Sequence, residues 1–183
     1  METYIAILRG INVSGHKKIK MAALKQQLEA LGFQMVRTYI QSGNVLFDHP
    51  KQDELSLAEL ISRMISREFG FLVPVIVKHS EAWKALVNNN PFLDNKGVEV
   101  TRLHATILAE KPDSELVSIL TKVENPPDEF TIKGEVVYLH CPLGYGRTKF
   151  TNTFFENKLK VVATTRNWKT VLHLNEMASN PSF

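Results

Sequence analysis

The chain has 183 residues, of which 44% are hydrophobic and 22% are charged, a composition typical of a globular protein with a sizeable core. A net charge of +3 is too small to indicate a polyanion-binding protein by itself. The one cysteine, Cys141, excludes an internal disulfide and suits a reducing compartment. We find no signal-like or membrane-spanning apolar run, and we therefore expect a cytoplasmic protein that does not engage a membrane.

The first 78 residues predict a β-α-β-β-α-β order. Gly32 and Gly70 each follow an apolar helical stripe and are placed to end a helix. Pro74 favours an edge position for the last strand, because proline cannot donate to a sheet. We predict strands at 4–9, 35–41, 44–48 and 72–78, and helices at 21–33 and 55–70.

The second half predicts the same order again, followed by one more helix. A hairpin around Gly134 resembles the hairpin around Gly43, which suggests an internal duplication. We predict strands at 103–109 and 161–165, a hairpin at 129–140, and helices at 114–123, 151–159 and 166–179. The predicted fold class is α+β, with two tandem ferredoxin-like repeats, antiparallel sheets and a C-terminal helix. The predicted domains are 1–78 and 103–183, joined by a connector at 79–102 that contains a short helix.

The hairpin "YIQSGNVLF" contains polar residues that suit either a turn or one wall of a ligand site. If Gly43 and Asn44 form the loop, Ile40 faces Phe47 across the strand pair, and Ser42 lies beside Val45. Arg37, Tyr39, Gln41 and Leu46 then share the other face of the sheet.

The loop "RGINVSGHKKIK" is the first candidate site. In a ferredoxin-like unit the first and third strands are adjacent and antiparallel, so Arg9 and Asn12 should lie beside the Gln41–Asn44 turn. A helix begins directly after this loop, and helix N-termini attract anions. Lys17, Lys18 and Lys20 would strengthen that field. The spacing of Gly10 and Gly15 matches a P-loop, but the Lys-Ser/Thr pair that should follow is absent. The alternative is a solvated basic loop.

Two further stretches combine cations with a helix start. In "CPLGYGRTKFTN", Arg147 and Lys149 precede a helix with Thr153 and Glu156 at capping-box spacing. The alternative is an ordinary glycine turn before a capped helix. In "TTRNWKT", Thr164 or Thr165 is expected to cap the last helix, which places Arg166 and Asn167 in its first turn. A cation at that position suggests an anionic partner.

The sequence gives little support for a metal site or for a catalytic nucleophile. The six histidines are dispersed without ligand spacing, so we predict no metal site. His104 and His140 are placed to approach each other across neighbouring strands, with Cys141 next to them. A lone cysteine is usually inert packing, however. The sequence identifies no catalytic residue and no cofactor.

Five stretches together resemble the bacterial domain-of-unknown-function family DUF1697: "RGINVSG", "KMAALKQQLEALGF", "VRTYIQSGNVLF", "YGRTKFTN" and "ATTRNWKT". The resemblance implies two ferredoxin-like repeats and transfers no reaction, since the family has no settled activity. Ser14 stands where the family motif more often has glycine. The motif positions here are Arg9, Gly10, Asn12, Tyr39, Gln41, Ser42, Gly43, Asn44, Tyr145, Gly146, Arg147, Lys149, Thr151, Asn152, Thr165, Arg166, Asn167 and Trp168.

We expect a protein that binds a phosphate-bearing or other anionic ligand, either a small molecule such as a nucleotide or a single-stranded nucleic acid. The alternatives are an enzyme acting on a small anionic substrate and a protein-interaction module without a ligand. The expected state is a monomer or a homodimer. The predicted ligand-binding residues are Arg9, Asn12, Lys17, Tyr39, Gln41, Ser42, Asn44, Tyr145, Arg147, Lys149, Asn152, Arg166 and Asn167.

Overall fold

The structure is a computed structural model that describes residues 1–180. The chain divides into two compact units, one formed by Met1–Lys84 with the end of the chain from Leu174, and one formed by Ala85–His173. Each unit contains a four-stranded antiparallel sheet, so the predicted α+β class and the tandem ferredoxin-like repeats are confirmed. Among the described residues, no helix is long and apolar enough to cross a membrane.

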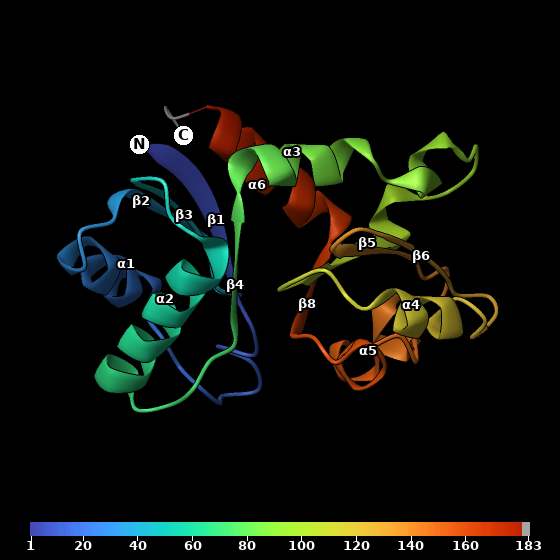
Figure 1. Cartoon of the computed structure of the whole chain (residues 1–183), viewed down its shortest axis with the longest axis horizontal. Coiled ribbons are helices and arrows are strands. Elements are labelled where there is room, and N and C mark those ends of the chain that lie inside the picture. Colours follow the sequence, from blue (N-terminus) through green and yellow to red (C-terminus); the bar gives the residue numbers. More distant parts are fainter. Residues whose placement is uncertain (181–183) are drawn as a thin grey trace. The chain divides into compact units, whose positions relative to one another are not determined.

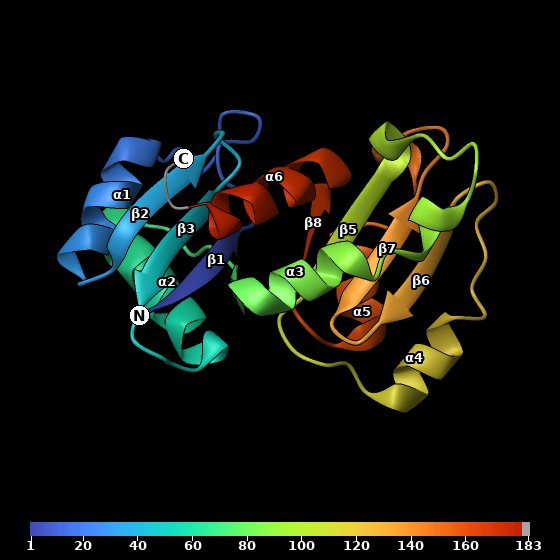
Figure 2. The same cartoon turned by 90° about the horizontal axis from the view of Figure 1, so that it is seen from above.

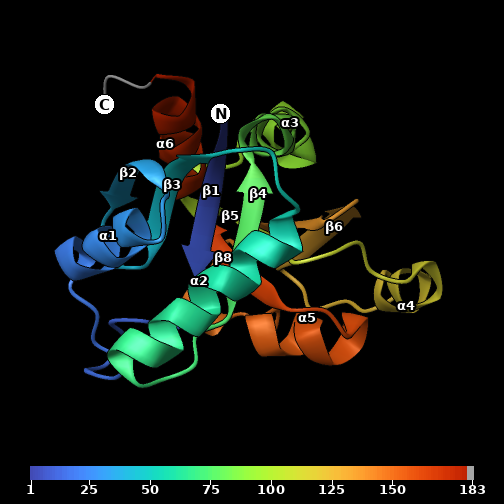
Figure 3. The same ribbon diagram turned by 60° about the vertical axis from the view of Figure 1, so that its left-hand side comes forward.

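The first unit follows the predicted β-α-β-β-α-β order. The sheet order is β2-β3-β1-β4, with β4 at an edge as Pro74 predicts. The elements are β1 (Glu2–Leu8), α1 (Met21–Ala30), β2 (Gln34–Tyr39), β3 (Asn44–His49), α2 (Glu54–Phe69) and β4 (Val75–His79). Helices α1 and α2 cover one face of this sheet (Figures 1 and 3).

The core of the first unit lies between that face and the two helices. Leu24 and Leu28 of α1 and Ile61 of α2 are fully buried against Val45 and Phe47 of β3. The opposite face of the sheet is also covered. Arg37 of β2 lies there and donates to the carbonyl of Met177 at 2.7 Å, near the C-terminal end of α6 (Trp168–Ser179) (Figure 2).

Ile5, Ile7 and Leu46 point away from α1 and α2, on the same face of the sheet as Arg37, and are fully buried.

The second unit repeats the order, with sheet order β6-β7-β5-β8. Its core lies between the sheet and helices α4 and α5, where Leu139 and Phe155 are fully buried. Its elements are β5 (Leu103–Leu108), α4 (Ser114–Leu120), β6 (Glu129–Lys133), β7 (Val136–His140), η3 (Tyr145–Arg147), α5 (Asn152–Leu159) and β8 (Ala163–Asn167). Between β4 and β5 the chain forms α3 (Ser80–Asn88) and two 3-10 turns, η1 (Pro91–Asp94) and η2 (Val100–Arg102).

The last strand of each repeat runs directly into a helix. β4 ends at His79 and α3 begins at Ser80, while β8 ends at Asn167 and α6 begins at Trp168. The prediction that Arg166 and Asn167 lie in the first helical turn is therefore wrong. The predicted threonine cap is wrong as well, because Asn167 Oδ1 accepts a hydrogen bond from the Thr170 N–H at 2.8 Å.

Candidate anion site and neighbouring polar clusters

The β1–α1 loop and the β2–β3 turn meet at one end of the first sheet, as the topology predicts. Ile7 of β1 pairs with Asn44 of β3, and the Leu8 N–H donates to the Gly43 carbonyl at 2.8 Å. The turn consists of residues 40–43, because Tyr39 pairs with Asn44. The predicted pairing of Ile40 with Phe47 is therefore wrong, since Ile40 lies in the turn and is half exposed.

Asn12 connects the loop to the turn through its side-chain amide. Its Nδ2 donates to the Ile19 carbonyl at 3.0 Å and to the Gln41 carbonyl at 2.8 Å, and its Oδ1 accepts from the Ile19 N–H at 2.9 Å. Both N–H groups of the amide and one lone pair of its oxygen are therefore in use within the protein. Asn12 thus fixes the backbone of the loop against the turn.

Asn44 has a similar structural role. It is fully buried, and its Nδ2 donates to the Tyr39 carbonyl at 3.1 Å and to Ser42 Oγ at 2.9 Å. Lys17 is bonded too, because its Nζ donates to the Leu72 carbonyl at 2.7 Å. Asn12 and Asn44 thus fix the backbone around the turn, whereas Lys17 connects the loop to the segment between α2 and β4.

The loop itself forms a small hairpin and does not wrap a helix start as a P-loop does. The Asn12 N–H donates to the Lys17 carbonyl at 3.1 Å, and the His16 N–H donates to the Val13 carbonyl at 2.9 Å. Ser14 lies at its tip with φ of 50°, a left-handed conformation that favours glycine. This explains physically why glycine suits that motif position.

A hollow of about 510 Å³ lies beside this loop, and the residues lining it are Asn12, Gly15, Lys18, Ile19, Lys20 and Gln41. Its volume is in the range of small-molecule sites. Its charged lining residues, among those that the structure describes, are the two lysines. Lys20 is also the N-cap residue of α1, makes no side-chain hydrogen bond to the helix backbone, and precedes a first turn without an acidic residue. The positive end of the α1 dipole is therefore not neutralised by its own first turn.

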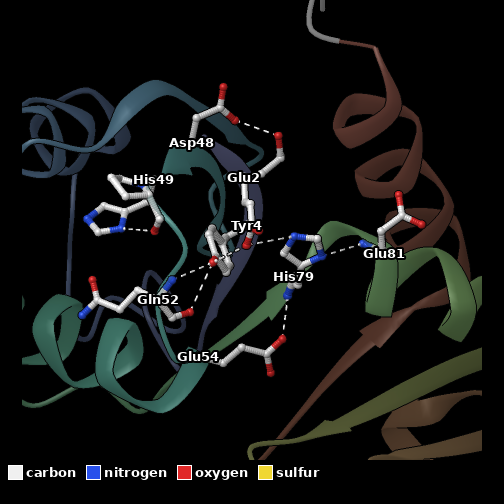
Figure 4. Close-up of polar contacts among 10 residues, drawn as sticks. Glu2, Tyr4, Asp48, His49, Gln52, Glu54, His79 and Glu81 are labelled. Atoms are coloured by element: carbon white, nitrogen blue, oxygen red, sulfur yellow. Dashed lines mark hydrogen bonds and ion pairs between the residues drawn. The ribbon is translucent and has the colours of Figure 1, made fainter.

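The other end of β1 carries a polar cluster that the sequence analysis missed (Figure 4). The Tyr4 hydroxyl lies 3.1 Å from Glu2 Oε2 and accepts from the Gln52 N–H at 3.1 Å. His79 Nδ1 accepts from the Glu81 N–H at 3.2 Å, so the neutral ring carries its proton on Nε2, which lies 3.5 Å from Glu2 Oε2. Burial is the largest of the causes that raise the pKa of Tyr4.

Glu54 completes this cluster from the start of α2. Its carboxylate accepts from the His79 N–H at 2.7 Å and pairs with the buried Lys78 ammonium at 3.2 Å. Tyr4 and His79 thus share the Glu2 carboxylate, beside a small hollow of about 260 Å³. No local sequence motif indicated the cluster, because its members come from β1, α2, β4 and the segments between them.

The motif residues of the second unit form an internal network around Thr165. Thr165 Oγ1 donates to Asn152 Oδ1 at 2.6 Å, so the hydroxyls of Tyr145, at 3.1 Å, and Thr106, at 2.7 Å, donate to Thr165. The His104 ring stacks on Tyr145 with a centroid distance of 4.9 Å. This network links η3, α5, β5 and β8, and gives Tyr145 and Asn152 structural partners.

The cap of α5 corrects a further prediction. Thr151 occupies the N-cap position and accepts from the Phe154 N–H, while Glu156 accepts from the Ala163 N–H of β8 at 3.1 Å. The predicted capping box between Thr153 and Glu156 is therefore wrong. Arg147 and Lys149 are exposed in the segment that precedes this cap.

Arg166 stands on the other face of the second sheet. It pairs with Ala105 and alternates with Thr165, so its side chain leaves β8 on the side away from the Tyr145 network. Burial lowers the pKa of Arg166 to about 10, which leaves it protonated at neutral pH. Its Nη1 donates to the Thr165 carbonyl at 3.0 Å.

The expected approach of His104 and His140 is wrong. His104 pairs with Leu139 and His140 with Leu103, so the two rings leave opposite faces of the sheet. Cys141 is fully buried, and burial is the main cause that raises its pKa to about 11. In the described part of the chain, no group of three or more histidine, cysteine or acidic residues is placed to hold a metal ion.

Two four-stranded antiparallel sheets, each built in the order β-α-β-β-α-β, define an α+β protein of tandem ferredoxin-like repeats. The model of the family described as "Protein of unknown function (DUF1697)" matches residues 1–138, and the chain belongs to this family. Of the five motifs that carry the resemblance, "YGRTKFTN" and "ATTRNWKT" lie beyond the matched residues.

A solved structure supports the same fold over nearly the whole chain. The conserved bacterial protein SP0830 from Streptococcus pneumoniae is 23% identical, and the similarity covers 97% of this chain and 98% of that chain with a TM-score of 0.73. At this identity the similarity concerns the fold alone. No curated protein matches the chain.

Proposed function

We propose that this protein binds a small phosphate-bearing or otherwise anionic ligand, such as a nucleotide, at the loop between β1 and α1. The observation that carries the proposal is the hollow of about 510 Å³ whose charged lining residues are Lys18 and Lys20, directly at the start of α1. Backbone N–H groups at a helix start and two ammonium groups offer an anion both hydrogen bonds and charge.

Comparison with two other helices of the chain supports this proposal. Helices α2 and α4 begin with a capping aspartate and carry a glutamate in the first turn, which is the usual way to offset a helix dipole. Helix α1 has neither feature. A bound anion would supply the missing negative charge.

A small ligand is favoured over a nucleic acid. The hollow has the volume of a metabolite site, and Arg37, on the sheet face that RNA-recognition domains leave open, is engaged by the Met177 carbonyl. The predicted residues of the second unit do not enter this proposal, because none of them lines the hollow.

The test is a thermal-shift screen of the full chain against inorganic phosphate, pyrophosphate, nucleotides and short single-stranded RNA and DNA, at low and physiological salt. A ligand at about 100 times its Kd adds roughly 2.7 kcal/mol, a shift of a few degrees. The double variant Lys18→Gln/Lys20→Gln should weaken binding about tenfold or more. The charge-matched control Lys84→Gln/Lys111→Gln, at exposed positions, should bind like the wild type.

Three outcomes would contradict the proposal. The first is that no anion stabilises the protein, and the second is that both double variants lose the same amount of affinity for the anion. The third is that only oligonucleotides bind and that their affinity falls steeply with salt. The last outcome would indicate a nucleic-acid-binding surface, because release of counterions makes such binding strongly salt-dependent.

A further inference from the structure

His79 occupies the N-cap position of α3, because β4 ends at this residue and α3 begins at Ser80. Its ring nitrogen Nδ1 accepts a hydrogen bond from the Glu81 N–H at 3.2 Å (Figure 4). Glu81 is the second residue of the helix, and its N–H is one of those that a helix leaves without a backbone partner. The imidazole therefore caps α3 in the way that an asparagine or serine side chain usually does.

The His79 ring can act as a cap only in its neutral form. A nitrogen that carries a proton cannot accept a hydrogen bond, so the proton of the neutral ring lies on Nε2. A second proton would occupy Nδ1 and would oppose the Glu81 N–H. The positive charge would also stand at the positive end of the α3 dipole, where cations are unfavourable.

The other side of the ring favours the protonated form. Nε2 lies 3.5 Å from Glu2 Oε2, and this contact becomes an ion pair when the ring is charged. The Tyr4 hydroxyl lies 3.1 Å from the same carboxylate, and the Tyr4 ring meets the imidazole edge to face at a centroid distance of 5.3 Å. Protonation thus exchanges the cap of α3 for a stronger contact with β1.

Other charged groups stand around His79. From β1, the segment before α2, α2 and α3, the titratable and charged groups are Glu2, Tyr4, Lys51, Glu54 and Glu81. The Glu54 carboxylate accepts from the His79 N–H at 2.7 Å and pairs with Lys78 Nζ at 3.2 Å. Glu54 is thus engaged by the backbone and by a lysine, and Glu2 is the carboxylate that receives the charged ring.

The His79 ring has space in which to respond to protonation. Its side chain is 31% exposed. It also borders a hollow of about 260 Å³, whose lining residues are Glu2, Tyr4, Lys51, Gln52, Glu54 and His79. Rotation of the charged ring moves Nδ1 away from the Glu81 N–H and leaves the start of α3 without its side-chain cap.

We propose that His79 is a proton-controlled cap, which holds the first turn of α3 when the ring is neutral and releases that turn when the ring is protonated. Histidine suits this role, since unperturbed side chains of this type change charge between pH 5 and 8. The turn is capped at the higher pH and uncapped at the lower pH. It ends in Trp83, which is fully buried, so the cap controls how firmly this end of α3 is anchored.

The test is NMR spectroscopy of the full ¹⁵N-labelled chain between about pH 8 and pH 5. We expect the neutral His79 ring to be protonated on Nε2 alone. The hydrogen-exchange protection of the Glu81 amide, corrected for the intrinsic pH dependence of exchange, should fall about fivefold as the ring takes up its second proton. His49 is an internal reference, because its Nδ1 lies 2.9 Å from the Pro50 carbonyl and carries the proton of the neutral ring.

The variant His79→Asn replaces the cap with one that does not titrate. Asparagine is among the best N-cap residues, so the Glu81 amide should keep its protection over the whole pH range. The matched control is His49→Asn. It removes a histidine that lies opposite Glu2 in the register of β1 and β3, and the Glu81 amide should respond to pH as in the wild type.

A neutral His79 ring protonated on Nδ1 would overturn the proposal, and so would a Glu81 amide whose protection does not fall with protonation of the ring. Both measurements use the wild type and do not depend on any variant folding. An unchanged pH response of Glu81 in His79→Asn would also overturn it, because another group would then control the turn.

Discussion

Asn12 Nδ2 donates to the Gln41 carbonyl at 2.8 Å, which joins the β1–α1 loop to the β2–β3 turn across 29 residues of sequence. The same amide also bonds both backbone groups of Ile19. We expect Asn12→Ala to lower the free energy of unfolding by about 3 kcal/mol, because three hydrogen bonds to the backbone are lost at about 1 kcal/mol each. Urea unfolding would measure this change.

The control for this experiment is Gln41→Ala. Only the main-chain carbonyl of Gln41 accepts the bond, and its side chain is exposed. We therefore expect Gln41→Ala to change the free energy of unfolding by less than about 0.5 kcal/mol. Equal effects of the two substitutions would contradict the role given to the Asn12 amide.

Gly43 has no space for a side chain. Its φ is +80°, and an added Cβ would lie 2.7 Å from Leu8 Cβ and 2.9 Å from Ile11 Cδ1. We expect Gly43→Ala to destabilise the protein by about 3 kcal/mol or more, since both strain and a backbone-fixed clash oppose it. Gly134→Ala is the matched control, because Gly134 also has a positive φ but open space around it.

Gly134→Ala should cost about 1 kcal/mol, the cost of a left-handed backbone alone. Thermal unfolding of the two variants would separate the cost of the clash, which is present only at Gly43, from the cost of the left-handed backbone, which is present at both positions. A loss at Gly43 no larger than that at Gly134 would show that Leu8 and Ile11 can move aside.

The partly buried ring of His104 predicts a dependence of stability on pH. Burial is the largest cause that lowers its pKa, and its Nδ1 is a buried atom without a hydrogen-bond partner in the described structure. Below pH 6.5 the unfolded chain takes up a proton at this residue more readily than the folded one. Stability contributed by neutral His104 is therefore lost as the pH falls below about 6.5, and the loss levels off below the folded pKa.

The variant His104→Phe keeps a ring against Tyr145 and removes the titration. Its free energy of unfolding should fall less than that of the wild type between about pH 7 and pH 5. Parallel pH profiles for the two proteins would contradict a lowered pKa of His104 in the folded state. The other five histidines are present in both proteins and cancel in the comparison.

Cys141 should resist alkylation in the native protein. It is fully buried, and with a pKa of about 11 the fraction of thiolate at pH 8 is on the order of one in a thousand. Reaction with iodoacetamide, followed by mass spectrometry, should be slow without denaturant and rapid in guanidinium chloride. Rapid labelling of the folded protein would contradict inert packing and would indicate a reactive thiol.

Much of the fold could be predicted because its signals are local or follow from topology. Gly32 and Gly70 mark helix ends, and the ferredoxin-like order alone brings Ile7 beside Asn44. The predicted register of the hairpin was wrong. The choice between a loop at Gly43–Asn44 and a turn of residues 40–43 depends on how the Asn44 side chain packs. That side chain is buried and bonded to Tyr39 and Ser42, which local sequence does not reveal.

The candidate site was predicted only in part. The cationic loop at the start of α1 follows from the sequence. Hydrogen bonds to residues distant in the sequence, however, determine which of its side chains are left to bind a ligand. Lys17 is bonded to Leu72 and Asn12 to Gln41, whereas Lys18 and Lys20 line the hollow. The Tyr4 cluster was missed because Glu2, Gln52 and His79 are separated in sequence and meet only when the sheet forms.

The direct junctions between strand and helix, at His79–Ser80 and Asn167–Trp168, give these two positions little tolerance for changes in length. A linker can absorb an inserted residue, but here one insertion would rotate the following helix by about 100° relative to the strand before it. That rotation would turn the buried indole rings of Trp83 and Trp168 away from their packing sites. Over evolutionary time these junctions should accept insertions or deletions very rarely.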